Sequence, residues 1–325
     1  MHTFGFADAS RGRPRLRDFA RDCAWAALFC ALLVPRTALG QPGTPPGKSK
    51  RPPLPPGAGG QGRGTGGRTK LPLPALGGGT GSPTSAAVLA GWLDDADTLA
   101  PGEAMVGVSF GRSESLDGGE TDAPVFDAAI GVSSRVQLSG SLPHYWASYS
   151  DGYESSGRGN TYLACKVKVL DPSGHRVGLA VAPMLEILGD ASLSDTTLGL
   201  SRVNWALPVS AQVGKGRLRG FATAGYFSRG AVFLAGALER AVSPRVSVTG
   251  ALSYMHATGP SEASDLAGLA RFRLDLTGSV FVRLSSSLSV AGAAGRTISS
   301  LDQNGAKLLA SASISYVFTL SRGHP

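Results

Sequence analysis

The sequence predicts an all-β protein, a transmembrane antiparallel up-and-down β-barrel of about 12 strands, and three observations carry this prediction. Apolar and small polar residues alternate through most of the chain from about residue 102 onward. Short and long connections between these alternating stretches follow one another in phase. The last stretch alternates as well and carries aromatic residues near the C-terminus. Because successive side chains of a strand point to opposite faces, each stretch has one apolar face, as in a barrel surrounded by lipid.

The final strand is expected at about 307–320. Ile314, Tyr316 and Phe318 share one of its faces, while Ser313 and Ser315 share the other. An alternating, aromatic last strand is typical of bacterial outer-membrane barrels. We therefore predict that Ile314, Tyr316 and Phe318 form a C-terminal assembly strand that the barrel-assembly machinery recognises, and that the apolar faces of the strands contact outer-membrane lipid.

Eleven further strands follow from the same alternation. They are expected at about 103–112, 125–133, 135–143, 160–170, 175–188, 196–213, 217–227, 231–240, 245–256, 266–284 and 288–297. Even-numbered strands end in tight turns such as 171–174, whose Pro172 and Gly174 suit a β-turn. Odd-numbered strands mostly end in longer connections, at 113–124, 144–159, 189–195, 257–265 and 298–306. This phase is expected of a barrel with both termini on the periplasmic side, and a soluble sandwich would not show it.

The first hundred residues divide into three parts. Residues 1–40 hold six arginines, five of them before the apolar run 23–34, and small residues at 38–40, which predicts an export signal cleaved after Gly40. An uncut inner-membrane anchor is the alternative. Residues 41–84 contain 13 Gly, 10 Pro and six basic residues, so we expect a disordered periplasmic tail. The tail is either a plain spacer or a ligand for peptidoglycan or lipid phosphate. Residues 85–101 lead into the barrel at 102–320.

The net charge of +8 belongs to the N-terminal region. Residues 1–84 hold 12 basic and three acidic residues, which leaves 19 basic and 20 acidic residues for 85–325. The barrel is therefore nearly neutral, and its charge does not support nucleic-acid binding.

Charged and polar side chains collect on the face opposite the apolar one. A charge placed in hydrocarbon costs roughly 2–4 kcal/mol for Lys or Arg at the midplane, so these side chains should point into the lumen. The predicted pore-lining residues are Lys166, Lys168, Glu186, Arg202, Asn204, Arg217, Arg219, Glu239, Arg271, Arg273, Asp275 and Arg283, with Asp127 adding a further negative charge. Two interpretations follow: a polar pore that mildly prefers anions, or a network of ion pairs that fills the lumen.

Catalysis and cofactor binding find little support. A barrel lipase needs Ser, His and Asn or Asp together near the rim, and His256 has no serine in the matching place. No His, Asp or Glu cluster has metal-ligand spacing, so no catalytic, metal or cofactor site is predicted. Cys165 is the single cysteine beyond residue 40, and it alternates with Leu163 and Val167 as a small apolar residue. The chain is not expected to be an enzyme.

Two stretches resemble a known family. Residues 93–103 (LDDADTLAPGE) are similar to the segment that precedes the first strand in the outer-membrane barrels named for the meta-pathway of phenol degradation, often described as transporter-like. Residues 141–145 (SLPHY), followed by 157–163 (GRGNTYL), resemble the family's passage from a strand through a proline and a loop into a lysine-bearing strand. Asn160 stands where the family usually has Asp, and Lys166 lies near the family's lysine. The resemblance covers about 93–320 and implies an outer-membrane channel for small organic molecules.

Two functions remain open from the sequence. The first is passive passage of small, organic or anionic molecules through the lumen in the outer membrane of a Gram-negative bacterium. The second is a non-conducting structural or surface barrel, in which the Tyr-, Ser- and Gly-rich connection 144–159 contacts an external partner.

Overall fold

The computed structural model describes residues 93–116, 118–149, 152, 154–171, 177–189, 202–215, 217–258, 272–299, 301 and 305–320. The predicted signal at 1–40, with its cleavage after Gly40, and the basic tail at 41–84 lie outside these residues, as does Arg271. Among the described residues, no helix is long and apolar enough to cross a membrane.

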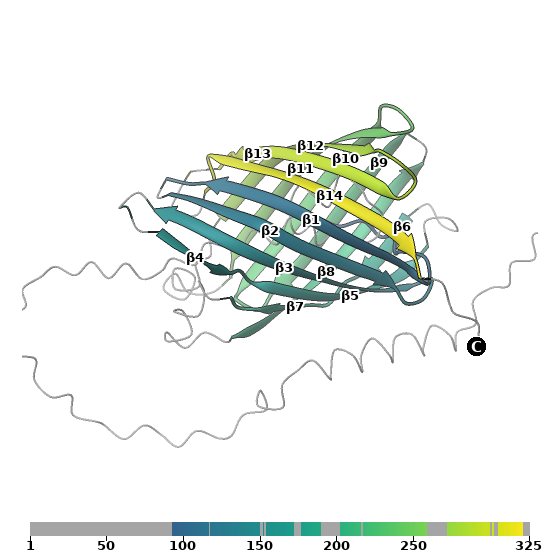
Figure 1. The fold of residues 1–325 in the computed structure, drawn as a ribbon, viewed down its shortest axis with the longest axis horizontal. Helices are drawn as coiled ribbons and strands as arrows, with labels where there is room; N and C mark the ends of the chain where they lie inside the picture. Colours follow the sequence, from purple (N-terminus) through teal and green to yellow (C-terminus); the bar gives the residue numbers. More distant parts are fainter. Residues whose placement is uncertain are drawn as a thin grey trace, which may run out of the picture. The chain divides into compact units, whose positions relative to one another are not determined.

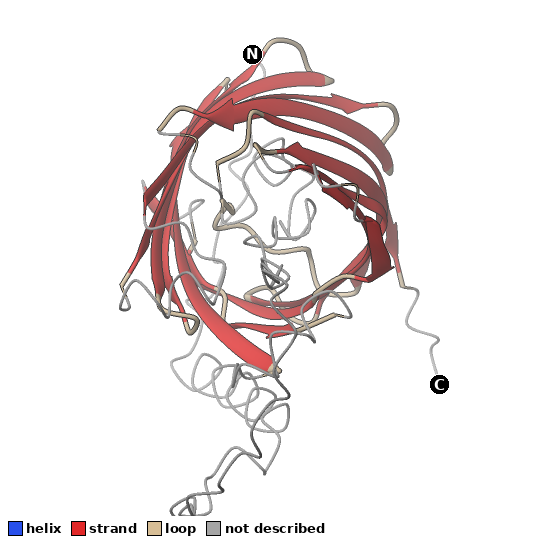
Figure 2. Cartoon of the chain, turned by 90° about the vertical axis from the view of Figure 1, so that its left-hand side faces the viewer, coloured by secondary structure: helices blue, strands red, loops and turns tan. Residues whose placement is uncertain are grey.

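The described chain forms a closed antiparallel β-barrel (Figures 1 and 2). Its strand segments are β1 (Glu103–Glu114), β2 (Gly118–Gly131), β3 (Val136–Tyr149), β4 (Glu154–Arg158), β5 (Thr161–Leu170), β6 (Val177–Val181), β7 (Met184–Ile187), β8 (Val203–Lys215), β9 (Leu218–Phe227), β10 (Ala231–Ala241), β11 (Val246–Ala257), β12 (Phe272–Arg283), β13 (Leu288–Thr297) and β14 (Leu308–Thr319). The barrel closes where β1 pairs with β14, from Glu103 opposite Thr319 to Glu114 opposite Leu308.

These segments make 12 strand positions around the barrel, which confirms the predicted fold class. β4 and β5 both pair with β3, so they are one strand position with a break between them. β6 and β7 both pair with β5 and with β8, and Ala182 and Pro183 separate them. The strand predicted at 175–188 is therefore interrupted, because Pro183 has no N–H to give to a ladder.

The barrel has two different ends. The turn end carries the connections 132–135, 171–176, 216–217, 242–245 and 284–287, and there the backbone N–H of Leu320 donates to the carbonyl of Gly102 at 2.8 Å. The opposite end, which we term the loop end, carries the connections 115–117, 150–153, 188–202, 228–230, 258–271 and 298–307. The first and last strands thus begin and finish at the turn end, as the phase of the connections predicted.

Two predicted loops are largely strand. The connection expected at 113–124 shrinks to 115–117, and most of the one expected at 144–159 is an extended hairpin of β3 with β4. The projecting parts carry polar pairs: Arg112 Nη1 donates to Thr121 Oγ1 at 2.9 Å, and the hydroxyls of Tyr145 and Ser155 lie 2.9 Å apart. The sequence prediction was wrong here because it followed apolar alternation, which fades where the ladder continues beyond the apolar band.

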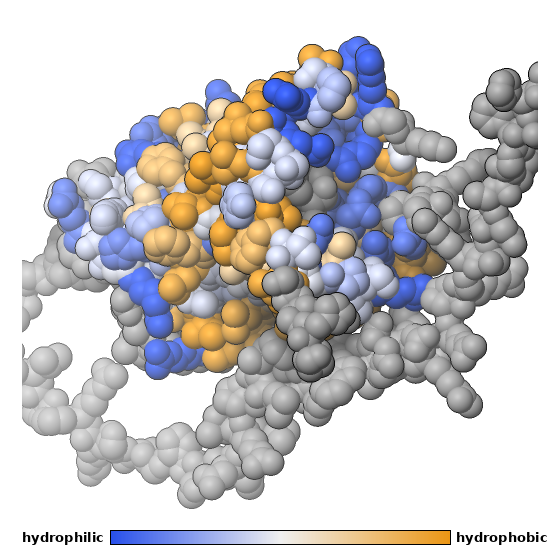
Figure 3. All heavy atoms as spheres, turned by 45° about the vertical axis from the view of Figure 1, so that its right-hand side comes forward, coloured by the Kyte–Doolittle hydropathy of each residue, from blue (hydrophilic) through white to orange (hydrophobic). Residues whose placement is uncertain are grey.

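The outer face of the barrel is apolar. Val108, Leu142, Leu252 and Ile314 are all more than 40% exposed although they lie mid-strand. Figure 3 shows apolar side chains over much of the visible barrel wall, with hydrophilic ones gathered toward its ends. The outward assignment of Ile314, Tyr316 and Phe318 agrees with this face, since Ile314 and Tyr316 are 46% and 48% exposed.

Candidate functional site: the lumen and the segment that crosses it

Residues 93–101, termed here the lumen segment, lie inside the barrel. Figure 2 looks along the barrel and shows a described non-strand segment within the ring of strands. Leu93 packs at one wall against Phe221, Ala235, Ala237 and Ala251 of β9–β11. At the other wall, Leu99 packs against Met105 of β1 and Ala129 of β2. The lumen segment therefore reaches from one side of the barrel to the other before the chain turns into β1.

Side chains of the inner wall hold the backbone of the lumen segment. The N–H of Leu99 donates to Oε1 of Gln137 at 2.8 Å. The N–H of Ala96 donates to Oε1 of Gln212 at 3.3 Å, and that of Asp94 to Oγ1 of Thr223 at 3.1 Å. A segment outside any ladder must find other partners for its buried backbone groups, and here the barrel supplies them.

An ion-pair cluster fixes the N-terminal part of the lumen segment. Lys166 Nζ lies 2.9 Å from Oδ1 of Asp94 and 3.0 Å from Oδ1 of Asp95. The side chains of Lys166 and Asp95 are each 1% exposed. Burial raises the pKa of the Asp95 carboxyl above its ordinary value, and the Lys166 ammonium opposes that rise. A lysine buried this deeply requires such partners, because an unpaired charge would cost several kcal/mol.

A close backbone approach at Gly131 seats the C-terminal part of the lumen segment. A Cβ atom at Gly131 would clash with the carbonyl oxygens of Leu99 and Ala100. The carbonyl of Gly131 also accepts a hydrogen bond from the N–H of Gly102 at 2.9 Å. Only a residue without a side chain allows the lumen segment to lie against β2 at this point.

A second buried cluster surrounds Glu186 of β7, toward the loop end. Its Oε1 accepts from Asn160 Nδ2 at 2.9 Å and from the Tyr162 hydroxyl at 3.1 Å. Its Oε2 accepts from Asn204 Nδ2 at 3.2 Å and pairs with Arg229 Nη2 at 3.1 Å. The Glu186 and Arg229 side chains are 0% and 2% exposed. The cluster ties the short β9–β10 connection to β5, β7 and β8.

Other predicted pore-lining residues also meet opposite charges. Arg219 Nε donates to Glu239 Oε1 at 2.9 Å, across the β9–β10 pair. Arg273 Nε lies 2.8 Å from Asp275 Oδ2, on the same inner face of β12. Lys168 lies 3.9 Å from the exposed Asp171. Ion pairs thus compensate much of the basic charge that the sequence placed inside the barrel.

The remaining predicted residues lie at the ends of the barrel. Arg202 is exposed just before β8, so it lies outside the strand in which it was placed. Arg217 is exposed between β8 and β9, and Arg283 ends β12 at the turn end. Asp127 is buried on β2 and accepts from the Ser109 hydroxyl at 3.3 Å.

The sequence reasoning missed the partners that matter most in the lumen. Asp94, Asp95 and Arg229 were not among the predicted pore-lining residues. A signal for the first two existed, because residues 94–97 form an acidic run directly before the first strand. Nothing local marks Arg229, which lies in a short connection and meets Glu186 only through the closure of the barrel.

The polar side chains that cluster in the lumen interact through hydrogen bonds and ion pairs. The histidines His144 and His256 contact aromatic rings on the outer side of the wall instead: His144 meets Trp146 edge-on at 4.7 Å between ring centroids, and His256 stacks on Tyr254 at 6.5 Å. Within the part of the chain that the structure describes, no group of three or more His, Cys, Asp and Glu side chains could hold a metal ion. Cys165 is free and buried.

No protein-family model matches this chain, and no curated protein sequence matches it. Solved structures do resemble its fold. An outer-membrane channel from Pseudomonas putida F1 is 15% identical, with a TM-score of 0.50 over 69% of this chain and 98% of that one. The KdgM porin in complex with disordered oligogalacturonate is 11% identical, with a TM-score of 0.47 over 66% and 99%. The NanC porin is 7% identical, with a TM-score of 0.44 over 66% and 98%. At these identities the similarity concerns the fold alone.

Proposed function

We propose that this chain is a channel of the bacterial outer membrane that passes small solutes, and that the lumen segment restricts its path. The observation that carries the proposal is a closed 12-strand barrel whose outer face is apolar and whose inner face is polar and charged. Such an inverted distribution suits a wall with lipid outside and water inside. The fold similarity to an outer-membrane channel from Pseudomonas putida F1 is consistent with it.

The location of the lumen segment sets the size of solute that we expect. A barrel of 12 strands is intermediate between small barrels filled by side chains and wide porins with an aqueous channel. The lumen segment takes up part of the cross-section, and its contacts with Gln137, Lys166 and Gln212 place it near the turn end. We therefore propose a narrow path for small molecules, with weak charge selectivity where Arg219, Arg273 and Lys166 line it, because all three are paired.

A non-conducting structural barrel is the second candidate, and a specific observation favours it. The lumen segment, the Lys166 cluster and the Glu186 cluster together cross-link the inner wall in the way expected of a filled lumen. In that case the extended β3–β4 hairpin at the loop end would be the surface that meets a partner.

Conductance separates the two candidates. The protein is purified, shown to be folded by its β-rich circular dichroism and heat-dependent gel mobility, and reconstituted into planar bilayers. The channel proposal expects discrete steady conductance steps. A folded barrel that leaves the bilayer silent, both as the wild type and after release of the lumen segment, would overturn it in favour of the structural barrel.

We make four further proposals from the sequence. We infer membership of the family named for the meta-pathway of phenol degradation from the resemblance at 93–103 and 141–163. We infer export by a signal cleaved after Gly40 from the composition of 1–40. Recognition of the last strand by the barrel-assembly machinery, and of the basic tail by peptidoglycan or lipid phosphate, rests on residue pattern and charge.

A further inference from the structure

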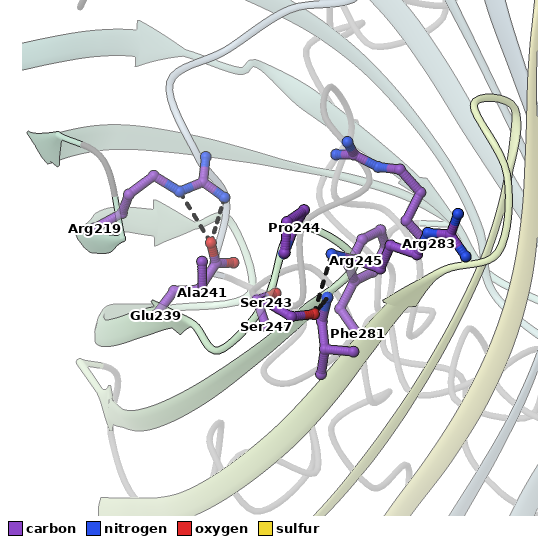
Figure 4. A pocket seen from close by; sticks show the side chains of 10 residues that line it. Arg219, Glu239, Ala241, Ser243, Pro244, Arg245, Ser247, Phe281 and Arg283 are labelled. Atoms are coloured by element: carbon purple, nitrogen blue, oxygen red, sulfur yellow. Dashed lines mark hydrogen bonds and ion pairs between the residues drawn. The ribbon is translucent and has the colours of Figure 1, made fainter.

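A pocket of about 280 Å³ opens on the inner wall at the turn end, between β9 and β12. Its lining residues are Arg219, Glu239, Ala241, Ser243, Pro244, Arg245, Val246, Ser247, Phe281 and Arg283 (Figure 4). Three arginines thus face a single glutamate. The pocket carries an excess of positive charge, unlike the ion-paired clusters around Lys166 and Glu186.

One of the three arginines is fixed in place. Arg219 donates through Nε to Glu239 at 2.9 Å, and its guanidinium carbon lies 5.1 Å from the ring centroid of Phe221. Glu239 is 4% exposed, so its carboxylate is buried in the pocket wall beside Arg219. Arg219 therefore forms a held, largely neutralised side of the pocket; Figure 4 draws its interactions with Glu239 as dashed lines.

The other two arginines lie together across the pocket. The backbone N–H of Arg283 donates to the carbonyl of Arg245 at 2.8 Å, which joins the end of β12 to the β10–β11 turn. Figure 4 shows both guanidinium groups on the side of the pocket opposite Arg219. Neither Arg245 nor Arg283 makes an ion pair with any carboxylate that the structure describes. Two guanidinium groups on the same side of a pocket, without a carboxylate partner, are suited to bind an oxyanion.

The lining also has an apolar part, beside the hydroxyl groups of Ser243 and Ser247. Phe281, which is 7% exposed, lines the pocket together with Pro244, Val246 and Ala241. An inorganic anion would leave this surface unused, whereas the apolar part of an organic acid would cover it.

We propose that this pocket binds small organic carboxylates, with the carboxylate on Arg245 and Arg283 and the apolar body on Phe281 and Pro244. The assignment of the bound molecule as a solute in transit rests on the proposed channel function. The pocket would collect such anions at the turn-end mouth of the lumen.

Ligand binding tests this inference without transport. Butyrate is titrated onto the folded, detergent-solubilised protein and followed by ligand-observed NMR, with butyramide as a neutral molecule of the same shape. We expect butyrate to bind and butyramide not to bind. The double variant Arg245→Gln, Arg283→Gln should weaken butyrate binding about fivefold or more, since it removes the charge-assisted hydrogen bonds.

Arg240→Gln is the matched control. Arg240 is an exposed arginine of β10 at the same end, next to Glu239 but on the outer face, so its loss should leave butyrate binding unchanged. Equal butyrate binding by the wild type and the double variant would overturn the proposal, as would equal binding of butyramide. Displacement of butyrate by inorganic phosphate at lower concentration would overturn the choice of an organic carboxylate. Failure of the channel function would instead appear as a silent bilayer with butyrate binding intact.

Discussion

The ammonium group of Lys166 lies 3.0 Å from a carboxylate oxygen of Asp95, although 71 residues separate them in the chain. Both side chains are almost completely buried inside the barrel. Lys166 belongs to the wall, on β5, and Asp95 belongs to the lumen segment. The pair therefore fastens a strand-free stretch of chain to the inner wall, and four predictions test this arrangement and the barrel around it.

Removing the charges that Lys166 binds should release the lumen segment. The double variant Asp94→Asn, Asp95→Asn loses both ion pairs with Lys166 but keeps the size of the two side chains. We expect larger conductance steps in planar bilayers, because a loosened segment no longer restricts the lumen. Glu154→Gln on the exposed β4 is the control and should conduct as the wild type does. Unchanged conductance of a folded double variant would mean that the lumen segment does not limit the path.

A steric change should have the same effect without altering any charge. Gly131→Ala places a methyl group against the carbonyl oxygens of Leu99 and Ala100 and should push the lumen segment from its seat. The matched control is Gly250→Ala on β11, where a Cβ atom has no neighbour within 4 Å. Conductance of Gly131→Ala should rise above that of both the wild type and Gly250→Ala. If the two variants behave alike, close packing at Gly131 does not position the segment.

Loss of the Glu186 charge should destabilise the barrel. Glu186→Gln leaves Arg229 buried without its counter-charge, and breaking such a pair costs about 3–5 kcal/mol in the free energy of unfolding. Glu114→Gln breaks the exposed pair with Arg112 and should cost about 1 kcal/mol or less. Urea unfolding in lipid vesicles measures both. Equal unfolding free energies for the two variants would contradict a structural role for the Glu186 cluster.

The depth of the apolar band can be measured on the outer face. Leu252→Arg, in the middle of β11, should cost roughly 2–4 kcal/mol of unfolding free energy, as expected for arginine near a bilayer midplane. Leu218→Arg, at the turn-end start of β9, should cost at most about 1 kcal/mol, because it lies at the edge of the band. The same unfolding measurement in vesicles applies. A larger cost at Leu218 than at Leu252 would mean that the barrel sits differently in the membrane.

The sequence by itself determined the barrel, its 12 strand positions and its two faces. This was possible because the period of two is a local property of a strand. Ile314 and Tyr316 are two residues apart, so their side chains share one face of the strand whatever strand lies beside it. The positions of the tight turns followed for the same reason, from local residues such as Pro and Gly. The hairpins at 113–124 and 144–159 were not predicted, because the strands there continue with polar residues on both faces and show no apolar alternation.

Only the tertiary structure decided what fills the barrel. The sequence placed Lys166, Arg219 and Glu186 on the inner face, but an ion pair depends on distances between strands that closure alone defines. Lys166 meets Asp95, and Glu186 meets Arg229, across 71 and 43 residues of chain. The lumen segment itself has no strand periodicity, so the alternation of apolar residues could not indicate that it turns inward. Its position follows from side chains of β3, β5, β8 and β9 that converge only once the barrel is closed.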